Sequence, residues 1–211
     1  MFSKDNRVRA GEFKVATLDL TSASATRARD TGVHFVQRVH LPPGAYEIRL
    51  AANQPEGGAG SVVAPLDVPA FDEPLAISGV TLGTSSSATQ LMLMDDVPLR
   101  EALGGPPTSI RRFRSADTLA AYVELYSDDR AVTAADLSVR AAIVKDTGLD
   151  LKAENATAVG GPSGEPRRMR FLARLALDGL EAGKYVLDVE GRGTRRQGQP
   201  VRRLIPFEII P

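Results

Sequence analysis

Two stretches of the chain, far apart in the sequence, repeat one local pattern. Each consists of an alternating strand, a Leu-x-x-Gly-x-Tyr turn and a second alternating strand. The first stretch runs from Phe35 to Leu50, and the second runs from Phe171 to Val189. A repeated supersecondary unit is typical of a chain that contains two copies of one domain type. The pattern therefore predicts two β domains in succession.

The tyrosine of each turn has a structural interpretation. In Greek-key sandwiches, a tyrosine near the start of a late strand donates its hydroxyl to the backbone of the preceding corner, while its ring fills the edge of the core. The glycine two residues earlier allows the sharp bend. We therefore expect structural corners, and not catalytic acids, at Leu41, Gly44 and Tyr46 and at Leu180, Gly183 and Tyr185.

Alternating apolar and polar residues, bounded by glycine and proline, predict strands in both halves of the chain. A polar loop is expected over 21–32, a short strand over 75–82 and a buried strand over 91–94. No long helical period is present, so an all-β protein is expected. The longer predicted strands cover 12–20, 33–41, 46–51, 61–68, 118–126, 137–145, 150–158, 168–177, 184–191 and 201–210.

These strands predict two tandem Greek-key β-sandwiches of the immunoglobulin-like or fibronectin III-like kind. The first covers residues 1–82, a linker covers 83–89, and the second covers 90–211. A complete sandwich of this kind has about seven strands, and fewer are predicted in the first half. An incomplete sandwich leaves an open sheet edge. We therefore expect strand 12–20 or 61–68 to pair with another chain or with an N-terminal segment.

Composition limits the classes of function. The chain has 26 basic and 26 acidic residues, a balance that does not favour a polyanion binder. It has no cysteine, which excludes disulfides, thiolate metal sites and cysteine nucleophiles. No apolar run is long enough to span a membrane, and the first residues contain no apolar signal core. We expect a piece of a longer exported protein whose signal lies upstream.

No combination of residues predicts a catalytic, cofactor-binding or metal-ligating site. His34 and His40 are predicted on one strand face about 20 Å apart, too far to share a metal or to act as a dyad. The pairs Asp95-Asp96 and Asp128-Asp129 fit turn chemistry better than a calcium site. The sequence contains no Ser-His-Asp grouping and no His-Glu-x-x-His motif.

The stretch from 167 to 203 contains ten basic and four acidic residues. Adjacent antiparallel strands could gather the basic residues into one patch. The sequence leaves two interpretations of this stretch: a solvated strand face, or a patch that binds an anionic partner. Nucleic acid is not expected, because Phe171 and Tyr185 fall at core-facing positions and cannot stack on bases. The basic residues are Arg167, Arg168, Arg170, Arg174, Lys184, Arg192, Arg195, Arg196, Arg202 and Arg203.

Three polar residues share one face of the predicted strand 118–126: Tyr122, Glu124 and Tyr126. Exposed tyrosines on a sandwich face can act as platforms for sugar rings, and core packing is an equal alternative. The chain contains no tryptophan and only four tyrosines. A carbohydrate site would therefore depend on these two tyrosines.

The turns and strands also form a longer motif, Leu41-Pro42-Pro43-Gly44-x-Tyr46, Gly60-Ser61-Val62, Leu66-Asp67-Val68-Pro69, Ile77-Ser78-Gly79-Val80 and Arg111-Arg112-Phe113-Arg114. Over residues 33–211 this order resembles the C-terminal portion of the von Willebrand factor A-related proteins of Acidobacteria. The metal-binding Asp-x-Ser-x-Ser motif of that family is absent, so no functional residue carries over. The resemblance implies the β-sandwich tail of an exported bacterial protein.

The leading hypothesis is a non-enzymatic protein-interaction or scaffold module with an unidentified protein partner. The partner would bind a sheet edge, a sheet face or the end loops. Pairing of edge strands between chains, or formation of a dimer, belongs to the same hypothesis. The alternative is a module that binds carbohydrate or another surface polymer. The expected location is extracellular or periplasmic, with no cofactor, nucleic acid or membrane span.

Overall fold

The structure is a computed structural model that describes two compact units. Unit 1 comprises residues 1–22 and 37–70, and unit 2 comprises residues 23–36 and 71–211. The described residues are 2–3, 8, 10–11, 13, 15, 17–53, 57–85, 91–94, 97–129, 131–145, 150–159, 168–193 and 198–211.

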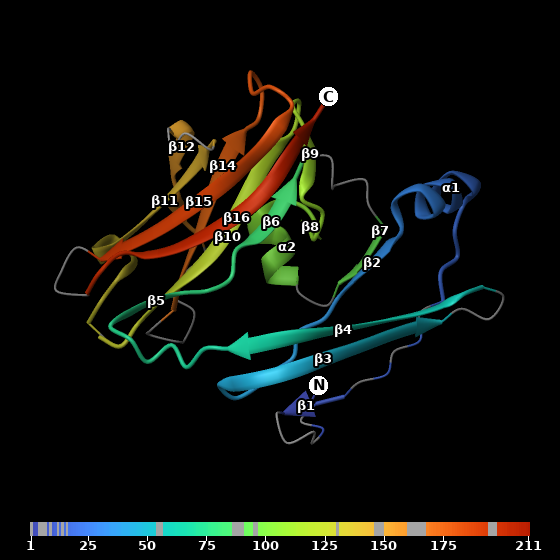
Figure 1. Ribbon diagram of the computed structural model, residues 1–211, viewed down its shortest axis with the longest axis horizontal. Helices are drawn as coiled ribbons and strands as arrows, with labels where there is room; N and C mark the ends of the chain where they lie inside the picture. Colours follow the sequence, from blue (N-terminus) through green and yellow to red (C-terminus); the bar gives the residue numbers. More distant parts are fainter. Residues whose placement is uncertain are drawn as a thin grey trace. The chain divides into compact units, whose positions relative to one another are not determined.

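Unit 2 contains a β-sandwich built from two sheets (Figure 1). The six-stranded sheet has the order β13-β14-β10-β6-β8, and β5 also pairs with β10. Its strands are β5 (Leu75–Ile77), β6 (Thr81–Thr84), β8 (Pro107–Thr108), β10 (Thr118–Ser127), β13 (Thr157–Ala158) and β14 (Arg168–Ala176).

The five-stranded sheet has the order β12-β11-β15-β16-β9. Neighbouring strands of this sheet are antiparallel, except that β16 runs parallel to β9. The strands are β9 (Arg112–Arg114), β11 (Leu137–Val144), β12 (Asp150–Asn155), β15 (Gly183–Gly193) and β16 (Val201–Ile210).

One apolar core joins the two sheets of unit 2. Because side chains alternate along a strand, every second residue of the long strands enters this core. The six-stranded sheet contributes Leu119, Ala121, Val123, Leu125, Phe171, Ala173 and Leu175, and the five-stranded sheet contributes Val139, Ala141, Ile143, Tyr185, Leu187, Val189, Phe207 and Ile209. The strands that the sequence predicts for this half are therefore confirmed, and so is the β-sandwich class.

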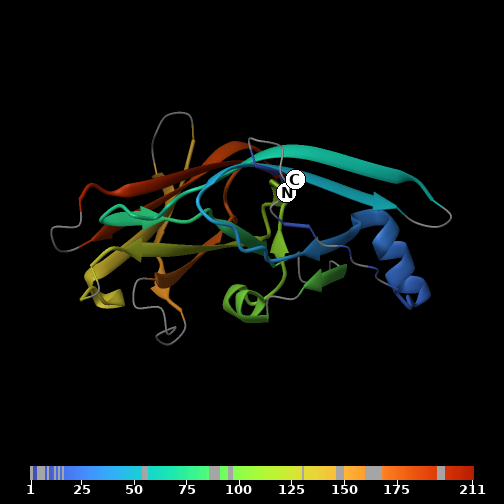
Figure 2. The same ribbon diagram turned by 90° about the horizontal axis from the view of Figure 1, so that it is seen from below.

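Smaller elements complete unit 2. The strands β2 (Val33–Val36) and β7 (Leu91–Met94) form a parallel pair. The helices are α1 (Ser22–Thr31), α2 (Val97–Leu103) and the 3-10 helix η2 (Ala134–Asp136). Figure 2 shows α2, in green, on the side of β10 that faces away from β15 and β16.

Unit 1 contains a three-stranded sheet with the order β1-β3-β4. Its strands are β1 (Phe2–Ser3), β3 (Gly44–Asn53) and β4 (Ala59–Val68). All described side chains of this unit are at least partly exposed, including Leu50 and Val62, which lie opposite each other in the register. Strand β4 is an edge of this sheet and has Pro65 near its middle, a residue typical of edge strands because it lacks the N–H group.

The hydroxyl bonds predicted for both tyrosine corners are confirmed, whereas the ring enters a buried core only at Tyr185. The Tyr46 hydroxyl donates to the Pro42 carbonyl at 2.7 Å, and the Tyr185 hydroxyl donates to the Glu181 carbonyl at 2.8 Å. Each tyrosine thus bonds the residue four positions earlier. Gly44 and Gly183 have φ of 149° and 158°, values that favour glycine.

The N-terminal half departs from the predicted elements. The described residues within 12–20 form no strand, and Phe13 and Val15 are largely exposed. The strand predicted over 33–41 ends at Val36. The loop predicted over 21–32 is mostly the helix α1, which Gly32 ends with a left-handed φ of 77° and an N–H donated to the Ala28 carbonyl.

The predicted domain boundary also differs from the observed division. Residues 75–82 were assigned to the first sandwich and 83–89 to a linker, but β5 and β6 pair with β10 inside unit 2. The reason is their apolar side chains: Leu75, Ile77 and Leu82 are buried in the sandwich core. The first predicted sandwich, 1–82, is therefore shared between the two units. Residues 86–90 lie outside the described residues, and the immunoglobulin-like tandem stays a prediction.

Candidate functional site

The outer face of the six-stranded sheet carries charged and aromatic residues on two neighbouring strands. In the β10–β14 register, Tyr122 lies opposite Leu172, Glu124 opposite Arg170, and Tyr126 opposite Arg168. Their neighbours Val123 and Phe171 enter the core, so these side chains project from the opposite face. We call Tyr122, Glu124, Tyr126, Arg168 and Arg170 the outer-face cluster.

Glu124 is held by the two tyrosines on its own strand. The Tyr122 hydroxyl donates to Oε1 at 2.8 Å, and the Tyr126 hydroxyl donates to Oε2 at 2.6 Å. Burial, with the adjacent carboxylate, raises the pKa of both tyrosines above their usual range. Both hydroxyls therefore stay protonated as donors, and each Glu124 oxygen has a short hydrogen bond.

The two arginines of the outer-face cluster approach Glu124 without a direct hydrogen bond. Arg168 Nη1 lies 3.9 Å from Oε2, and Arg170 Nε lies 3.8 Å from Oε1. Both distances exceed the hydrogen-bond range. The Arg170 Nε atom is buried, and no group of the described residues accepts a hydrogen bond from it. All three side chains are largely enclosed, with exposed fractions of 16% for Glu124, 20% for Arg168 and 27% for Arg170.

Apolar groups enclose both tyrosines. Tyr122 is 8% exposed and packs with Leu103 of α2 and with Leu172 of β14. Tyr126 stacks on Phe71 with 4.2 Å between ring centroids. Phe71 itself has a φ of 53°, which is uncommon for a residue other than glycine. Of the two alternatives that the sequence leaves open, the structure selects core packing for Tyr122.

The C-terminus of α2 is fixed to the same face. The Gly104 and Gly105 N–H groups donate to the Glu101 and Arg100 carbonyls in a Schellman arrangement. Arg174 of β14 donates from Nη2 to the Leu103 carbonyl at 3.0 Å, where a cation also suits the helix dipole. A small hollow of about 160 Å³ beside it is lined by parts of β6, α2 and β10 together with Arg174.

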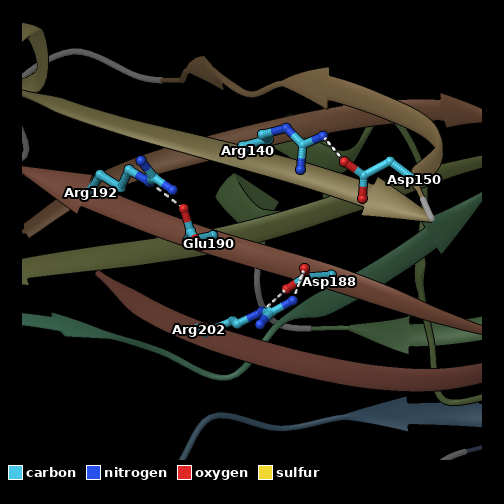
Figure 3. A network of polar contacts seen from close by, with 6 residues as sticks. All are labelled: Arg140, Asp150, Asp188, Glu190, Arg192 and Arg202. Atoms are coloured by element: carbon cyan, nitrogen blue, oxygen red, sulfur yellow. Dashed lines mark hydrogen bonds and ion pairs between the residues drawn. The ribbon is translucent and has the colours of Figure 1, made fainter. Parts of the chain in front are cut away.

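The outer face of the five-stranded sheet has a different charge arrangement (Figure 3). Figure 3 draws three of its ion pairs, Arg140 with Asp150, Arg192 with Glu190, and Arg202 with Asp188, and a fourth joins Arg112 to Glu208 at 3.1 Å. Arg202 binds both oxygens of the buried Asp188, and this hydrogen bonding raises the pKa of the Arg202 guanidinium. Each of these ion pairs is neutral as a whole.

The basic residues of 167–203 do not gather into one patch. Arg168, Arg170 and Arg174 lie on the six-stranded sheet, whereas Lys184, Arg192, Arg202 and Arg203 lie on the five-stranded sheet. The physical reason is that β14 and β15, although joined by a tight turn, belong to opposite layers of the sandwich. Arg203 donates to the Ile77 and Ser78 carbonyls. Arg167, Arg195 and Arg196 lie outside the described residues.

The other candidate residues lie apart from the outer-face cluster. His34 is in β2, and His40 is exposed beyond the end of that strand. Asp129 accepts the Ala131 N–H at 2.8 Å, as predicted for turn chemistry, and Asp95-Asp96 lie outside the described residues. Among the described residues, no three His, Cys, Asp or Glu side chains lie together as metal ligands. No helix formed by those residues is long and apolar enough to cross a membrane.

Sequence reasoning found the tyrosines and Glu124 on one strand, and it found Arg168 and Arg170 as part of a basic stretch. It did not bring the two groups together. Alternation along each strand shows which of its residues share a face. It does not show how the two strands align, because the register that sets Glu124 opposite Arg170 depends on contacts between residues distant in sequence.

Comparisons with known proteins add little to this description. No family model matches the sequence, and no curated protein matches it. One similar solved structure is a family 123 glycoside hydrolase from Clostridium perfringens, studied for glycolipid glycan hydrolysis. It is 11% identical with a TM-score of 0.37, and the match covers 65% of this chain and 27% of that one. A likeness of this size carries no argument about function.

Proposed function

We propose that the chain is a non-enzymatic protein-interaction module that binds its partner on the outer face of the six-stranded sheet. The observation that carries this proposal is the different make-up of the two outer faces. The five-stranded sheet carries a series of arginine–carboxylate ion pairs, whereas the six-stranded sheet carries the outer-face cluster, in which two tyrosines and two arginines surround Glu124. Tyrosine and arginine side chains are the groups that most often dominate protein–protein contacts.

The carbohydrate alternative depends on open tyrosine rings, and this face offers few. Tyr122 lies beneath α2, and Tyr126 already stacks on Phe71. A protein segment needs no aromatic platform and can follow the strands of a sheet face. We therefore place the protein partner first, and binding to a glycan array is the test of the alternative.

The absence of cysteine allows a direct test of which face binds. Thr157 is exposed on β13 and lies opposite Leu172, on the same face as the outer-face cluster. Ser138 is exposed on β11 and lies opposite Arg192, on the outer face of the other sheet. Thr157→Cys and Ser138→Cys each give a unique site for a maleimide-linked polyethylene glycol chain.

Peptides are first selected from a random phage-displayed library on the wild-type chain. Their binding is then measured on both labelled variants by biolayer interferometry. We expect the polymer at position 157 to abolish binding and the polymer at position 138 to leave it unchanged. Equal effects at both positions, or selection of no peptide, would contradict the proposed function.

We also propose that the module works outside the cytoplasm as part of an exported protein. Support comes from the motif order that resembles the tails of von Willebrand factor A-related proteins. Fractionation of the native cells, followed by detection with an antibody against the chain, tests this location. Detection in the cytoplasmic fraction alone would contradict it.

A further inference from the structure

Strand β4 forms an open edge of the sheet in unit 1. In the order β1-β3-β4 it has a neighbour on one side only, and its register with β3 is continuous from Ala59 to Val68. Among the described residues, no strand pairs with its other side, and those within 12–20 form no strand at all. An open edge presents backbone N–H and C=O groups with which a further strand can pair.

The first half of β4 lacks the features that protect most sheet edges. Proteins guard an edge with charged residues, prolines, bulges or very short strands. Residues 59–64 have the sequence AGSVVA, without a charge or a proline, and the residues from 59 to 63 are exposed. The proline and the acidic residue of the strand, Pro65 and Asp67, come later, towards residue 70, where the chain leaves unit 1. The unguarded half therefore lies beside the hairpin loop, away from that exit.

The hairpin of β3 and β4 also has one apolar face. Because side chains alternate along each strand, Leu50 and Val62 lie on one face, and Arg49 and Val63 lie on the other. Leu50 is 60% exposed and Val62 is 54% exposed, so this apolar face reaches the open edge uncovered. The pairs on this face are Tyr46 with Leu66, Ile48 with Ala64, and Leu50 with Val62. A strand added at the edge should therefore be uncharged, with apolar residues in the same alternation.

We propose that β4 pairs with β4 of a second copy of this chain, antiparallel about a two-fold axis that passes through Val62. An interface of this symmetry must be self-complementary, and β4 has the composition that its own edge requires. Only Asp67 is charged in the strand, and this axis sets it opposite position 57 of the second copy, beyond the end of β4. No like charges of the two strands therefore lie opposite each other. The dimer involves unit 1 and does not depend on the function proposed for the outer-face cluster.

The position of the axis follows from the alternation of side chains and from Pro65. The apolar faces of the two copies coincide only if the numbers of paired residues add to an even value. An axis at Val62 pairs Ser61 with Val63, and it leaves Pro65, which cannot donate, at the end of the paired stretch opposite Ala59. The exposed apolar pair of each copy then joins that of the other in one row across four strands.

A pairing of this length gives a weak and reversible dimer. About seven paired residues, 59–65, span about 24 Å at about 3.4 Å per residue, and the small area that they join is typical of a transient interface. We therefore expect a Kd in the micromolar range. Sedimentation velocity of the full chain should show a change from monomer to dimer between about 1 and 300 µM.

The charge at position 62 tests whether this edge joins the two copies. Val62→Lys sets two positive charges opposite each other, and Val62→Glu sets two negative charges opposite each other, so each variant alone should raise the Kd of the dimer about tenfold. An equimolar mixture of the two variants should restore the dimer, because opposite charges then face each other.

Leu204→Lys is the matched control. Leu204 is exposed to a similar extent in β16 of unit 2, and its substitution should leave the Kd within about twofold of the wild type. Circular dichroism confirms that all three variants are folded.

Because the chain has no cysteine, the register can be tested separately. In the proposed pairing the two copies of position 62 are directly opposite, with Cα atoms about 5 Å apart, which a disulfide can bridge. The two copies of position 61 are diagonal neighbours about 7–8 Å apart, which is too far. On oxidation with diamide, Val62→Cys should therefore form a linked dimer faster than Ser61→Cys, as followed on non-reducing gels.

A wild-type chain that stays monomeric at all these concentrations would overturn the inference and leave the edge to a strand of another protein. A dimer whose Kd responds equally to Val62→Lys and Leu204→Lys would overturn it as well, and so would a charge mixture that stays monomeric. Faster linkage at position 61 than at position 62 would overturn the register centred on Val62.

Discussion

Tyrosines perform two different tasks in this molecule. Tyr46 and Tyr185 close chain corners through hydroxyls that bond to carbonyls four residues earlier. Tyr122 and Tyr126 direct their hydroxyls at one carboxylate. The first task was predictable, since a corner is encoded within six residues. The second was not predictable, because the cluster around Glu124 also includes Arg168 and Arg170. These two arginines come close to Glu124 only because β14 pairs with β10.

The outer-face tyrosines make the free energy of unfolding depend on pH in the alkaline range. Burial raises the pKa of Tyr122 and Tyr126 above the ordinary value of 10.0, so the folded state keeps protons that the unfolded chain loses. Their contribution is therefore complete below about pH 10 and decreases as the pH rises further. We expect the free energy of unfolding of the wild-type chain to fall more steeply above pH 10 than that of the Tyr122→Phe/Tyr126→Phe variant.

Urea unfolding followed by circular dichroism between pH 8 and pH 12 measures both slopes. The double variant also loses hydrogen bonds at neutral pH, at about 1 kcal/mol each, so the comparison is of slopes and not of absolute values. Parallel slopes for the two proteins would show that the two hydroxyls ionise normally.

At the scale of elements, the sandwich depends on close contact between its sheets. Gly191 lies in β15 opposite Leu125 of the other sheet, and a Cβ atom there would meet Leu125 Cδ2 at 2.6 Å and Val201 Cγ2 at 3.2 Å. Leu125 is fully buried and cannot swing into solvent. The Gly191→Ala substitution should therefore overpack the core and destabilise the protein by about 1–3 kcal/mol.

Urea denaturation midpoints measure this effect, and Gly79→Ala is the control. A Cβ at Gly79 would meet nothing within 4 Å, so that variant should stay within about 0.5 kcal/mol of the wild type. If Gly191→Ala is no less stable than Gly79→Ala, the two sheets are not packed as closely as described.

The elements also show where local sequence patterns succeed and fail. Strands such as β10, β14 and β16 alternate clearly and were predicted within a few residues. Helix α1 was missed because its sequence, SASATRARDT, is polar apart from three alanines and has no apolar stripe to mark a period of 3.6 residues. The strand predicted over 12–20 alternates too, but alternation forms a strand only where another strand pairs with it.

At the scale of the whole molecule, burial is concentrated in one unit. Every residue of the described buried core belongs to unit 2, whereas the strands of unit 1 expose apolar side chains such as Leu50 and Val62. Sequence patterns did not predict this inequality, since the two Leu-x-x-Gly-x-Tyr turns look alike. The difference arises because β5 and β6 pair with β10 in the six-stranded sheet, although in the sequence they come after β3 and β4 of unit 1.

Unequal burial predicts unequal protection of the backbone. Amides that lie over a packed core open only in large unfolding events, whereas those of a partly exposed sheet open locally. Deuterium uptake measured by mass spectrometry should therefore be faster for peptides from β3 and β4 than for peptides from β10 and β15. Equal protection of the two units at all times would contradict the description of unit 1.

The place of β16 has a consequence for how the molecule is made. This strand pairs with β15 on one side and with β9 on the other, so it joins two parts of its sheet. On the ribosome, a nascent chain that has emerged only as far as β15 has β9 and β15 without the strand that lies between them. The five-stranded layer therefore closes only after residues 201–210 leave the exit tunnel, and until then its unfinished edges are a natural target for chaperones.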